Sequence, residues 1–571
     1  MNMVPQPDTP VSSERTRPLV EACYAAAFLG ALVLCIMLPS QPWSLAIGHP
    51  TGDLSDHLQG MWEFGSRVMN GELPLLAQTT HFPTSSPVWF VDPVGGLMAV
   101  PLRWMGPIHS YNFVLALQLW LAAVAGWGMA RSFGASSRGG LVAGAFIGSS
   151  PFLLGLVHSG ISEGLGMAPV ILFSWALLRA MGRGPDDHGP SWRAGIVASL
   201  MLMWVGLQSP VYLAGALVLC IGATLGCFRL IPQRLGILAI IWGLAYLPLR
   251  ALEDLITHTL GAGDEIAGSI PPGWQPAGIP AIDLVGFVHP GAYYFPDTPS
   301  LGNPGILQIH YLGLIAVLLA IAGWRRLKTI RGPVLWMLIL CMGPSLCLYK
   351  THIPSLEAPL LLPASMLWMQ GSPLDFIHHP YRLVAVLLPL MAVMIAMGSD
   401  RLSARMASGA GVLIVLEALF VSPAPWPLTT TDATPPAIYA ELPAGPVMDW
   451  PPDATDWNRR YVRWQAGHGQ QIAYGVNTTF PDAARHDPLL WKTFIQMTQP
   501  GDQLKNRDIP GRPPRHTERP RTLAQQGFTT LVLHKGAMPE GDFGRMSRTL
   551  TQGLGPPAVR DEQSWAWVLS D

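Results

Sequence analysis

Long apolar runs recur along the chain and limit what it can fold into. Each is long enough, as a helix, to cross a hydrocarbon layer of ~30 Å. The runs lie near residues 20–39, 111–131, 138–157, 161–181, 192–208, 210–229, 234–250, 308–325, 331–349, 380–399 and 406–423. The sequence therefore predicts a polytopic α-helical membrane protein with about eleven transmembrane helices.

Composition supports this class and argues against others. Only 12% of the 571 residues are charged, about half the share in soluble proteins. The net charge of −1 gives no general attraction to nucleic acid, so no nucleic-acid partner is expected. The six cysteines all lie in or beside apolar runs, and none belongs to a zinc-binding pattern. We interpret them as buried apolar side chains.

The distribution of positive charge predicts the orientation. With residues 1–19 in the cytoplasm, the cytoplasmic segments carry fifteen Lys and Arg, whereas the opposite side carries five before residue 424. This bias favours an odd number of spans and an exported C-terminus. We interpret the first run as an uncleaved anchor. The membrane domain then covers residues 20–423, with large exported loops at 40–110, 251–307 and 350–379.

Short elements outside the spans are also predicted. Val94–Met105 and Leu360–Trp368 are apolar but too short to cross, which is typical of helices lying in the membrane interface. After residue 423 the composition becomes polar, and residues 424–571 predict a small exported α/β domain. Its expected strands are "GPVMDW", "FTTLVLH" and an edge strand "SWAWVLS"; its expected helices are Arg521–Gln526 and Phe543–Leu554.

A polar cluster follows the first span, in the stretch "GHPTGDLSDHLQGMW". If residues 53–64 form a helix, Asp53 shares one face with Asp56 and His57, three and four positions later. Two compatible interpretations stay open. Asp53 caps the helix, or its carboxylate serves as a general base with Asp56 and His57 as supporting groups.

Further polar residues lie at the ends of predicted spans. His158 and Glu163 flank the tight turn "HSGISEG", where they are either solvated turn residues or face the same cavity as Asp53. Asp92 and Asp283 either line that site or cap turns.

Several short motifs follow one another in a recognisable order. They are Gly52-Asp53 with His57 and Trp62, Phe82-Pro83-Thr84 with Asp92-Pro93, Tyr111-Asn112, Gly148–Pro151, Asp283-Leu284 with His289-Pro290, and "HHPYRL" at 378–383. In this order they resemble the GT-C membrane glycosyltransferases. Within that family, the chain looks like a largely uncharacterised bacterial group of polytopic proteins with a small exported C-terminal domain. The resemblance spans roughly residues 20–400.

The resemblance implies a GT-C-like fold in the bacterial inner membrane and a transfer reaction at its outer face. The donor would be a sugar linked to polyprenyl phosphate, and the acceptor a glycan, lipid or protein. Asp53 would be the base of an inverting reaction. Arg382, His378, His379 and Lys350 are the candidates for holding the lipid phosphate, or interfacial anchors. Asp53 and Asp56 are the candidate ligands if the enzyme uses Mg or Mn.

Two alternatives belong to other classes. A GT-C-like scaffold without catalysis would share the fold and differ in lacking activity. A transporter or flippase is less favoured, because only Glu417 lies well inside a span and no inverted repeat is apparent.

Overall fold

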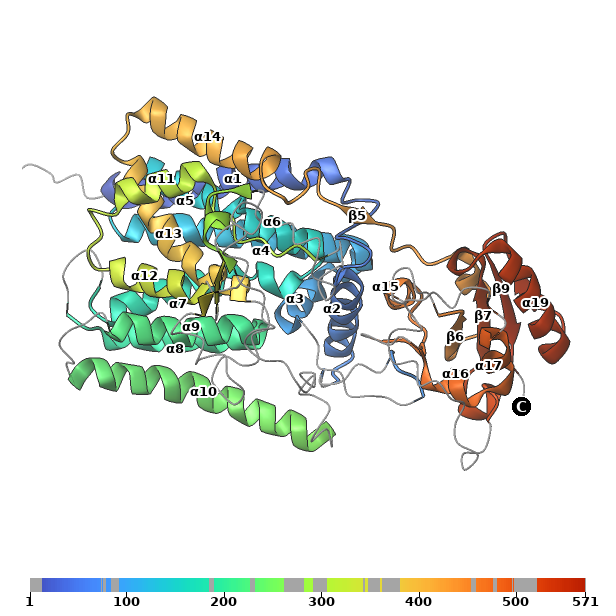
Figure 1. Cartoon of the computed structure of the whole chain (residues 1–571). Helices are drawn as coiled ribbons and strands as arrows, with labels where there is room; N and C mark the ends of the chain where they lie inside the picture. The colour runs from blue at the N-terminus through green and yellow to red at the C-terminus, as the bar shows by residue number, and fades with distance from the viewer. Residues whose placement is uncertain are drawn as a thin grey trace, which may run out of the picture.

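The computed structural model describes most of the chain. The described residues are 13–72, 74, 79–83, 92–183, 189–225, 232–260, 282–290, 306–341, 345–347, 360–361, 380–452, 459–475, 480–495, 497 and 521–569. A helical bundle forms one part, and a smaller unit built from the C-terminal residues lies at one end of it (Figure 1).

Apolar helices build the bundle at every position where the sequence predicts a span. They are α1 (Ser13–Met37), α4 (Pro107–Ser132), α5 (Ser137–Gly148), α6 (Pro151–Ser159), α7 (Met167–Ala180), α8 (Trp192–Gln208), α9 (Pro210–Leu225), α10 (Pro232–Leu260), α11 (Leu314–Gly323), α12 (Arg331–Cys341), α13 (Val384–Ser399) and α14 (Ala404–Phe420). Every residue of α13 is buried, so this helix forms the centre of the core.

Six helices among the described residues are long and apolar enough to cross a membrane. They are Pro18–Ser40, Pro107–Ser132, Ser137–Ser159, Ser162–Ala180, Pro232–Ala251 and Pro380–Ser399. The apolar helices at Val211–Ala223, Leu314–Gly323 and Arg331–Cys341 are shorter. The count of about eleven crossings therefore stays a prediction.

Two predicted spans are wrong in their extent. The run 308–325 is helical only from Leu314, because the amide of Leu312 donates instead to the carbonyl of Phe287. The run 331–349 ends as a helix at Cys341, and β3 (Ser345–Cys347) follows. This strand pairs with β2 (Ile282–Asp283) in parallel and with β4 (Leu360–Leu361) in antiparallel orientation.

The predicted interfacial helices have different outcomes. Val94–Met105 is helical, as α3 (Pro93–Ala99) and a 3-10 helix at Val100–Met105. The helix predicted to begin at Leu360 is wrong at its start, because residues 360–361 pair their backbone with β3. The rest of that segment lies outside the described residues, as does most of the predicted loops 251–307 and 350–379.

The C-terminal unit contains a four-stranded sheet in the order β6-β7-β9-β8. Its strands are β6 (Val447–Trp450), β7 (Thr530–His534), β8 (Val559–Arg560) and β9 (Ser564–Val568). Strand β9 is not the predicted edge strand, because β8 folds back and pairs with its outer side. The helices are α15 (Arg459–His468), α16 (Asp482–His486), α17 (Pro488–Ile495) and α19 (Glu540–Leu554), and only residues 524–526 of the predicted helix 521–526 form a 3-10 turn.

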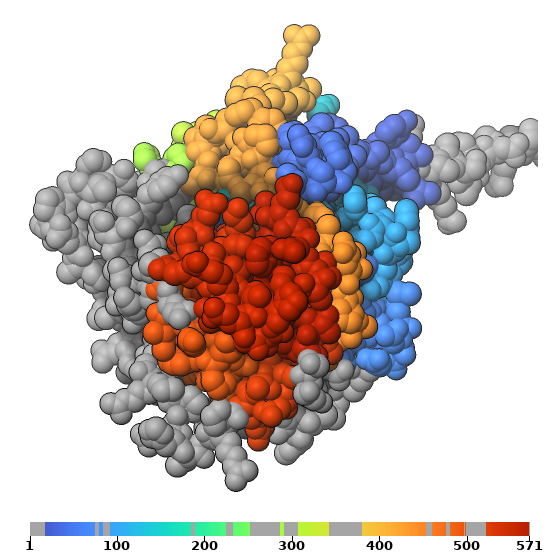
Figure 2. All heavy atoms as spheres, turned by 90° about the vertical axis from the view of Figure 1, so that its right-hand side faces the viewer, coloured from blue at the N-terminus to red at the C-terminus, as the bar shows by residue number. Residues whose placement is uncertain are grey.

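Three sets of contacts join this unit to the bundle. Helix α2 (Leu54–Met69) packs against α15. In the segment that leads from the bundle into the unit, β5 (Thr430–Thr431) pairs with β1 (Ala46–Ile47) in antiparallel orientation. Residues 79–82 of the first loop also exchange backbone hydrogen bonds with Ile472 and Tyr474. The C-terminal unit, in orange and red, thus covers one end of the bundle (Figure 2).

Candidate functional site

Asp53 occupies the residue before α2, but its side chain does not cap that helix. Its backbone amide donates to the carbonyl of Ser159 at 2.7 Å, which fixes the start of α2 against the end of α6. The carboxylate Oδ1 accepts instead from Nη1 of Arg459, on α15, at 3.0 Å. The Asp53 side chain is 27% exposed and that of Arg459 is 13% exposed. The carboxylate is therefore paired with a cation from the C-terminal unit.

The contact between α2 and α6 depends on Gly160. This residue has φ +73°, and a Cβ placed on it would lie 2.4 Å from the backbone nitrogen of Leu54. Only glycine combines this left-handed conformation with so close an approach. The start of α2, and with it Asp53, is thereby set directly on the α6 turn.

Asp56 and His57 are buried in the first turn of α2. Burial raises the pKa of the Asp56 carboxyl to about 6, and the nearby charge of Arg459 opposes this rise. Burial lowers the pKa of His57, so the imidazole is held neutral near pH 7. Its Nδ1 lies 3.0 Å from the hydroxyl oxygen of Ser162.

Asp92 both caps a helix and joins the site. Its Oδ1 accepts from the amide of Gly95 at 2.7 Å, at the start of α3. Its Oδ2 accepts from the Ser162 hydroxyl at 2.7 Å. Burial raises the pKa of the Asp92 carboxyl, and these hydrogen bonds oppose the rise. Since Ser162 donates to Asp92, its oxygen is left to accept from Nδ1–H of His57.

Glu163 links His57 to Arg382. Burial raises the pKa of the Glu163 carboxyl to about 7, which favours a protonated carboxyl whose Oε2 lies 3.3 Å from the unprotonated Nε2 of His57. Oε1 of Glu163 lies 3.8 Å from Nη1 of Arg382. Arg382 belongs to a 3-10 helix, Pro380–Leu383, that leads into α13. Asp53 is also within electrostatic range of both Arg382 and Glu163. Five predicted residues besides Asp53 thus share one network, namely Asp56, His57, Asp92, Glu163 and Arg382.

His158 lies near this network but is turned to another partner. Its Nδ1 is 2.8 Å from the hydroxyl of Thr429, and its ring centroid is 5.2 Å from that of His49. The side chain thus contacts the segment after α14. Asp283 lies in β2, opposite Cys347 of β3. Lys350, His378 and His379 lie outside the described residues.

Arg459 and Ser162 belong to this site and were not predicted from the sequence. Arg459 is separated from Asp53 by 406 positions, and no short motif marks it. One available signal was the spacing of Arg459, Arg460 and Arg463 in the C-terminal region. On a helix these residues are close neighbours, and Arg463 does reach α2, donating to the Ser55 hydroxyl at 3.1 Å.

The arrangement around Asp53 does not fit a divalent cation. In the described part of the chain, no group of three or more His, Cys, Asp or Glu side chains could hold a metal ion. The guanidinium of Arg459 already lies against Asp53 and would repel a cation there. The residues around Asp53 thus do not suit a metal-assisted step.

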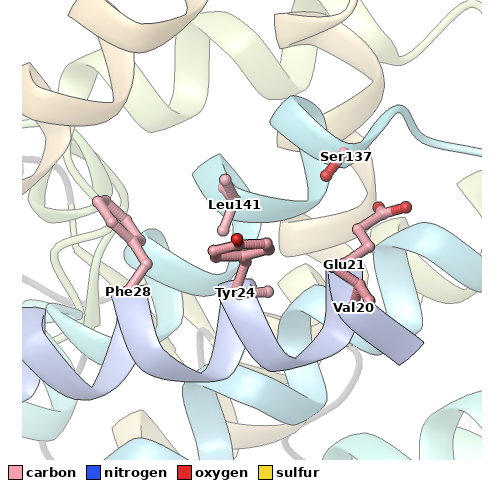
Figure 3. Close-up of a pocket in the computed structure, with 7 residues that line it drawn as sticks. Val20, Glu21, Tyr24, Phe28, Ser137 and Leu141 are labelled. Carbon is pink, nitrogen blue, oxygen red and sulfur yellow. The ribbon is translucent and has the colours of Figure 1, made fainter. Parts of the chain in front are cut away.

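A cavity of about 610 Å³ lies between α1 and α5 (Figure 3). Tyr24 and Phe28 of α1 and Leu141 of α5 give it a mostly apolar lining. It is near the start of α1, whereas Asp53 follows the end of that helix. It is not part of the site.

Comparison with known proteins yields structural neighbours only. No family model matches the sequence, and no curated protein does. Archaeal oligosaccharyltransferase AglB from Archaeoglobus fulgidus, in complex with an inhibitory peptide and a dolichol-phosphate, is similar over 92% of this chain and 72% of its own, with 10% identity and a TM-score of 0.43. The oligosaccharyltransferase of the same organism in complex with Zn and sulfate is similar over 92% and 70%, with 11% identity and a TM-score of 0.40.

A third structure, of that oligosaccharyltransferase tethered to an acceptor peptide, covers 90% of this chain and 69% of its own, with 11% identity and a TM-score of 0.41. At such low identity and TM-score, the likeness carries no conclusion about activity.

Proposed function

We propose that the chain is a membrane glycosyltransferase of the GT-C type, which moves a sugar from a polyprenyl-phosphate-linked donor to an acceptor at the outer face of the membrane. The observation that supports this most is the network around Asp53. It places a partly exposed carboxylate beside the buried Asp56 and His57, with arginines at both ends. Both signs of charge that the reaction requires are therefore close together.

The proposal gives Asp53 the role of general base. A base must reach the attacking hydroxyl, and the exposure of Asp53 leaves it accessible while Arg459 fixes Oδ1. An oxocarbenium-like transition state is stabilised by nearby negative charge. A single displacement assisted by one base inverts the anomeric carbon.

Arg382 and Arg459 are the cations in the described structure that the proposal assigns to the departing lipid phosphate. Guanidinium groups suit phosphate oxygens because they donate in a planar fork. Glu163, 3.8 Å from Arg382, is far enough that a phosphate can replace it as the main partner. His57 and Asp92 act through Ser162 and Glu163 and are positioning residues.

A transporter is less favoured, because Glu417 has a structural role. Its Oε1 accepts from the Tyr311 hydroxyl at 2.5 Å and from the amide of Leu314 at 2.6 Å, and its Oε2 accepts from the amide of Ile315 at 3.2 Å. The carboxylate of α14 thus caps the start of α11. Such a fixed group is poorly suited to relaying protons.

Placement in the bacterial inner membrane, with the C-terminus outside, is part of the proposal and follows from the charge bias of the loops. The acceptor, a glycan, lipid or protein, is also part of the proposal and is implied by the family resemblance. A non-catalytic scaffold would have the same fold and differs from the proposal in one measurable respect, the turnover of a lipid-linked sugar.

The test is mass spectrometry of lipids that copurify with the full-length protein, followed by a transfer assay on Asp53→Asn. We expect a lipid-linked sugar in the wild type, and its accumulation without transfer in the variant. The matched control is Asp482→Asn, which removes an exposed Asp–Arg pair within the C-terminal unit. Undiminished transfer by Asp53→Asn would refute the role of Asp53 as the base, whereas a wild type that neither copurifies with nor turns over a lipid-linked sugar would leave the scaffold.

A further inference from the structure

A second cavity, of about 650 Å³, lies within the C-terminal unit on the side of α15 that faces the sheet. Its walls come from four segments, which are residues 432–437, α15, the end of β7 and the turn between β8 and β9. Small-molecule sites usually measure ~300–1,000 Å³. The cavity is therefore large enough for an organic ligand.

Buried polar side chains form its floor. Arg463, His534 and Ser564 line the cavity and are 5%, 3% and 1% exposed. Buried polar groups at a cavity wall are costly unless they are held in hydrogen bonds. Nδ1 of His534 lies 3.0 Å from the Ser564 hydroxyl, and its Nε2 lies 2.9 Å from Asp449 Oδ1.

Tyr439 and His468 support these buried polar side chains on the side away from the cavity. The hydroxyl of Tyr439 donates to Asp449 Oδ1 at 2.5 Å, and its ring stacks on that of His468 with the centroids 4.2 Å apart. Asp449, His534 and Ser564 form a chain of hydrogen bonds. Asp449 lies in β6, His534 is the last residue of β7, and Ser564 is the first residue of β9. The polar floor is thus preorganised by the sheet.

The lining carries both signs of charge. Arg460 and Arg463 supply hydrogen-bond donors, and Asp432, Asp561 and Glu562 supply carboxylate acceptors. The carboxylates disfavour an anionic ligand, and the arginines disfavour a cationic one. A neutral ligand with many hydroxyl groups suits this lining, because each hydroxyl both donates and accepts. Trp464 adds an aromatic surface for the C–H face of a sugar ring.

We propose that this cavity binds a short neutral saccharide. Its wall α15 is also the helix that reaches the candidate base, through Arg459 to Asp53 and through Arg463 to Ser55. A saccharide in this cavity would thus be separated from the Asp53 network by α15. If the proposed transfer reaction holds, the anchored group is part of the acceptor glycan; this second step rests on the proposed function, whereas the binding itself does not.

The experiment is saturation-transfer NMR on the full-length protein in nanodiscs. The probe is a mixture of glucose, galactose, mannose, N-acetylglucosamine and rhamnose with their common disaccharides, together with glucuronic and galacturonic acid. Trp464 packs in two core clusters, so its removal risks unfolding. The test variant is therefore Arg460→Ala with Gln563→Ala, which changes only the less buried lining. The control is Arg548→Ala, an exposed arginine of α19 that does not line the cavity.

We expect saturation transfer to at least one neutral sugar. The Kd should rise about tenfold in the double variant, the effect of losing two hydrogen bonds, and stay unchanged in Arg548→Ala. Transfer only to the uronic acids, no transfer at all, or equal binding by the double variant would each overturn the proposal. Binding is measured again in Asp53→Asn; it should persist there even if the transfer reaction is absent, which separates this proposal from the proposed function.

Discussion

The ion pair between Arg459 and Asp53 joins two separately packed parts of the molecule, and its removal has a measurable consequence. Exposed ion pairs contribute ~0–1 kcal/mol, whereas hydrogen bonds to charged, buried groups contribute ~1.5–3 kcal/mol. The Arg459–Asp53 pair has an N–O distance of 3.0 Å and side-chain exposures of 13% and 27%. Its contribution to stability should therefore lie between these two ranges. We expect Arg459→Ala to cost ~1–2 kcal/mol. At ~1.4 kcal/mol per factor of ten, α15 should open about five to thirty times more often.

Hydrogen–deuterium exchange on the full-length protein measures this opening directly, since protected amides exchange in proportion to it. The amides of α15 should exchange faster in Arg459→Ala by that factor, while those of α13 should not change. Arg485→Ala is the matched control. It removes an arginine paired with Asp482 in the same unit, whose carboxylate is 67% exposed.

A double-mutant cycle then tests whether the effect passes through Asp53. In an Asp53→Asn background, Arg459→Ala should have much less effect on the exchange of α15. If it accelerates exchange equally in both backgrounds, the arginine stabilises α15 by other contacts, and the assignment of the pair as a connection between the two parts is refuted.

Three further predictions follow from other residues. Burial raises the pKa of the Asp56 carboxyl from 3.8 to about 6. The contribution of this carboxyl to stability is therefore complete below pH ~4 and is lost as the pH rises through 6. Asp56→Asn should abolish this pH dependence and raise the thermal stability at pH 8 by up to ~3 kcal/mol. Glu417→Gln should lower thermal stability by ~1 kcal/mol through a weaker cap on α11; an unchanged melting temperature would contradict that role. Gly160→Ala should destabilise the protein by more than the ~1–2 kcal/mol of the left-handed conformation alone, because its Cβ meets Leu54; circular dichroism melts check this.

The sequence predicts the helices well because apolar periodicity and length are local properties. The start of α11 and the end of α12 were mispredicted, because Leu312, Leu346 and Cys347 lie in largely apolar runs and yet have backbone partners outside the helices. Hydropathy measures the preference of side chains for an apolar setting, and it does not show where a backbone amide is bonded. The same reason explains the strand at 360–361.

The site was predictable where its residues belong to ordered motifs, as with Asp53, His57 and Asp92. Arg459 was not, because its role depends on how the C-terminal unit sits on α2, and this is a tertiary property. His158 shows the converse. His158 precedes Ser159, whose carbonyl accepts from the amide of Asp53, so the two backbones are close. The position of His158 on α6 nevertheless directs its side chain toward Thr429.

The composition of the chain becomes polar after residue 423, but the next ten residues still pack against the helices of the bundle. Ala424, Leu428 and Ala433 belong to the core of the bundle, and the indole nitrogen of Trp426 donates to the carbonyl of Ile36 at 3.2 Å. A polypeptide cut where the composition changes would therefore strip the helices of part of their own core and leave β1 unpaired. Any attempt to express the two halves separately should divide the chain beyond residue 433, and even then the membrane half would carry Asp53 without its counter-ion.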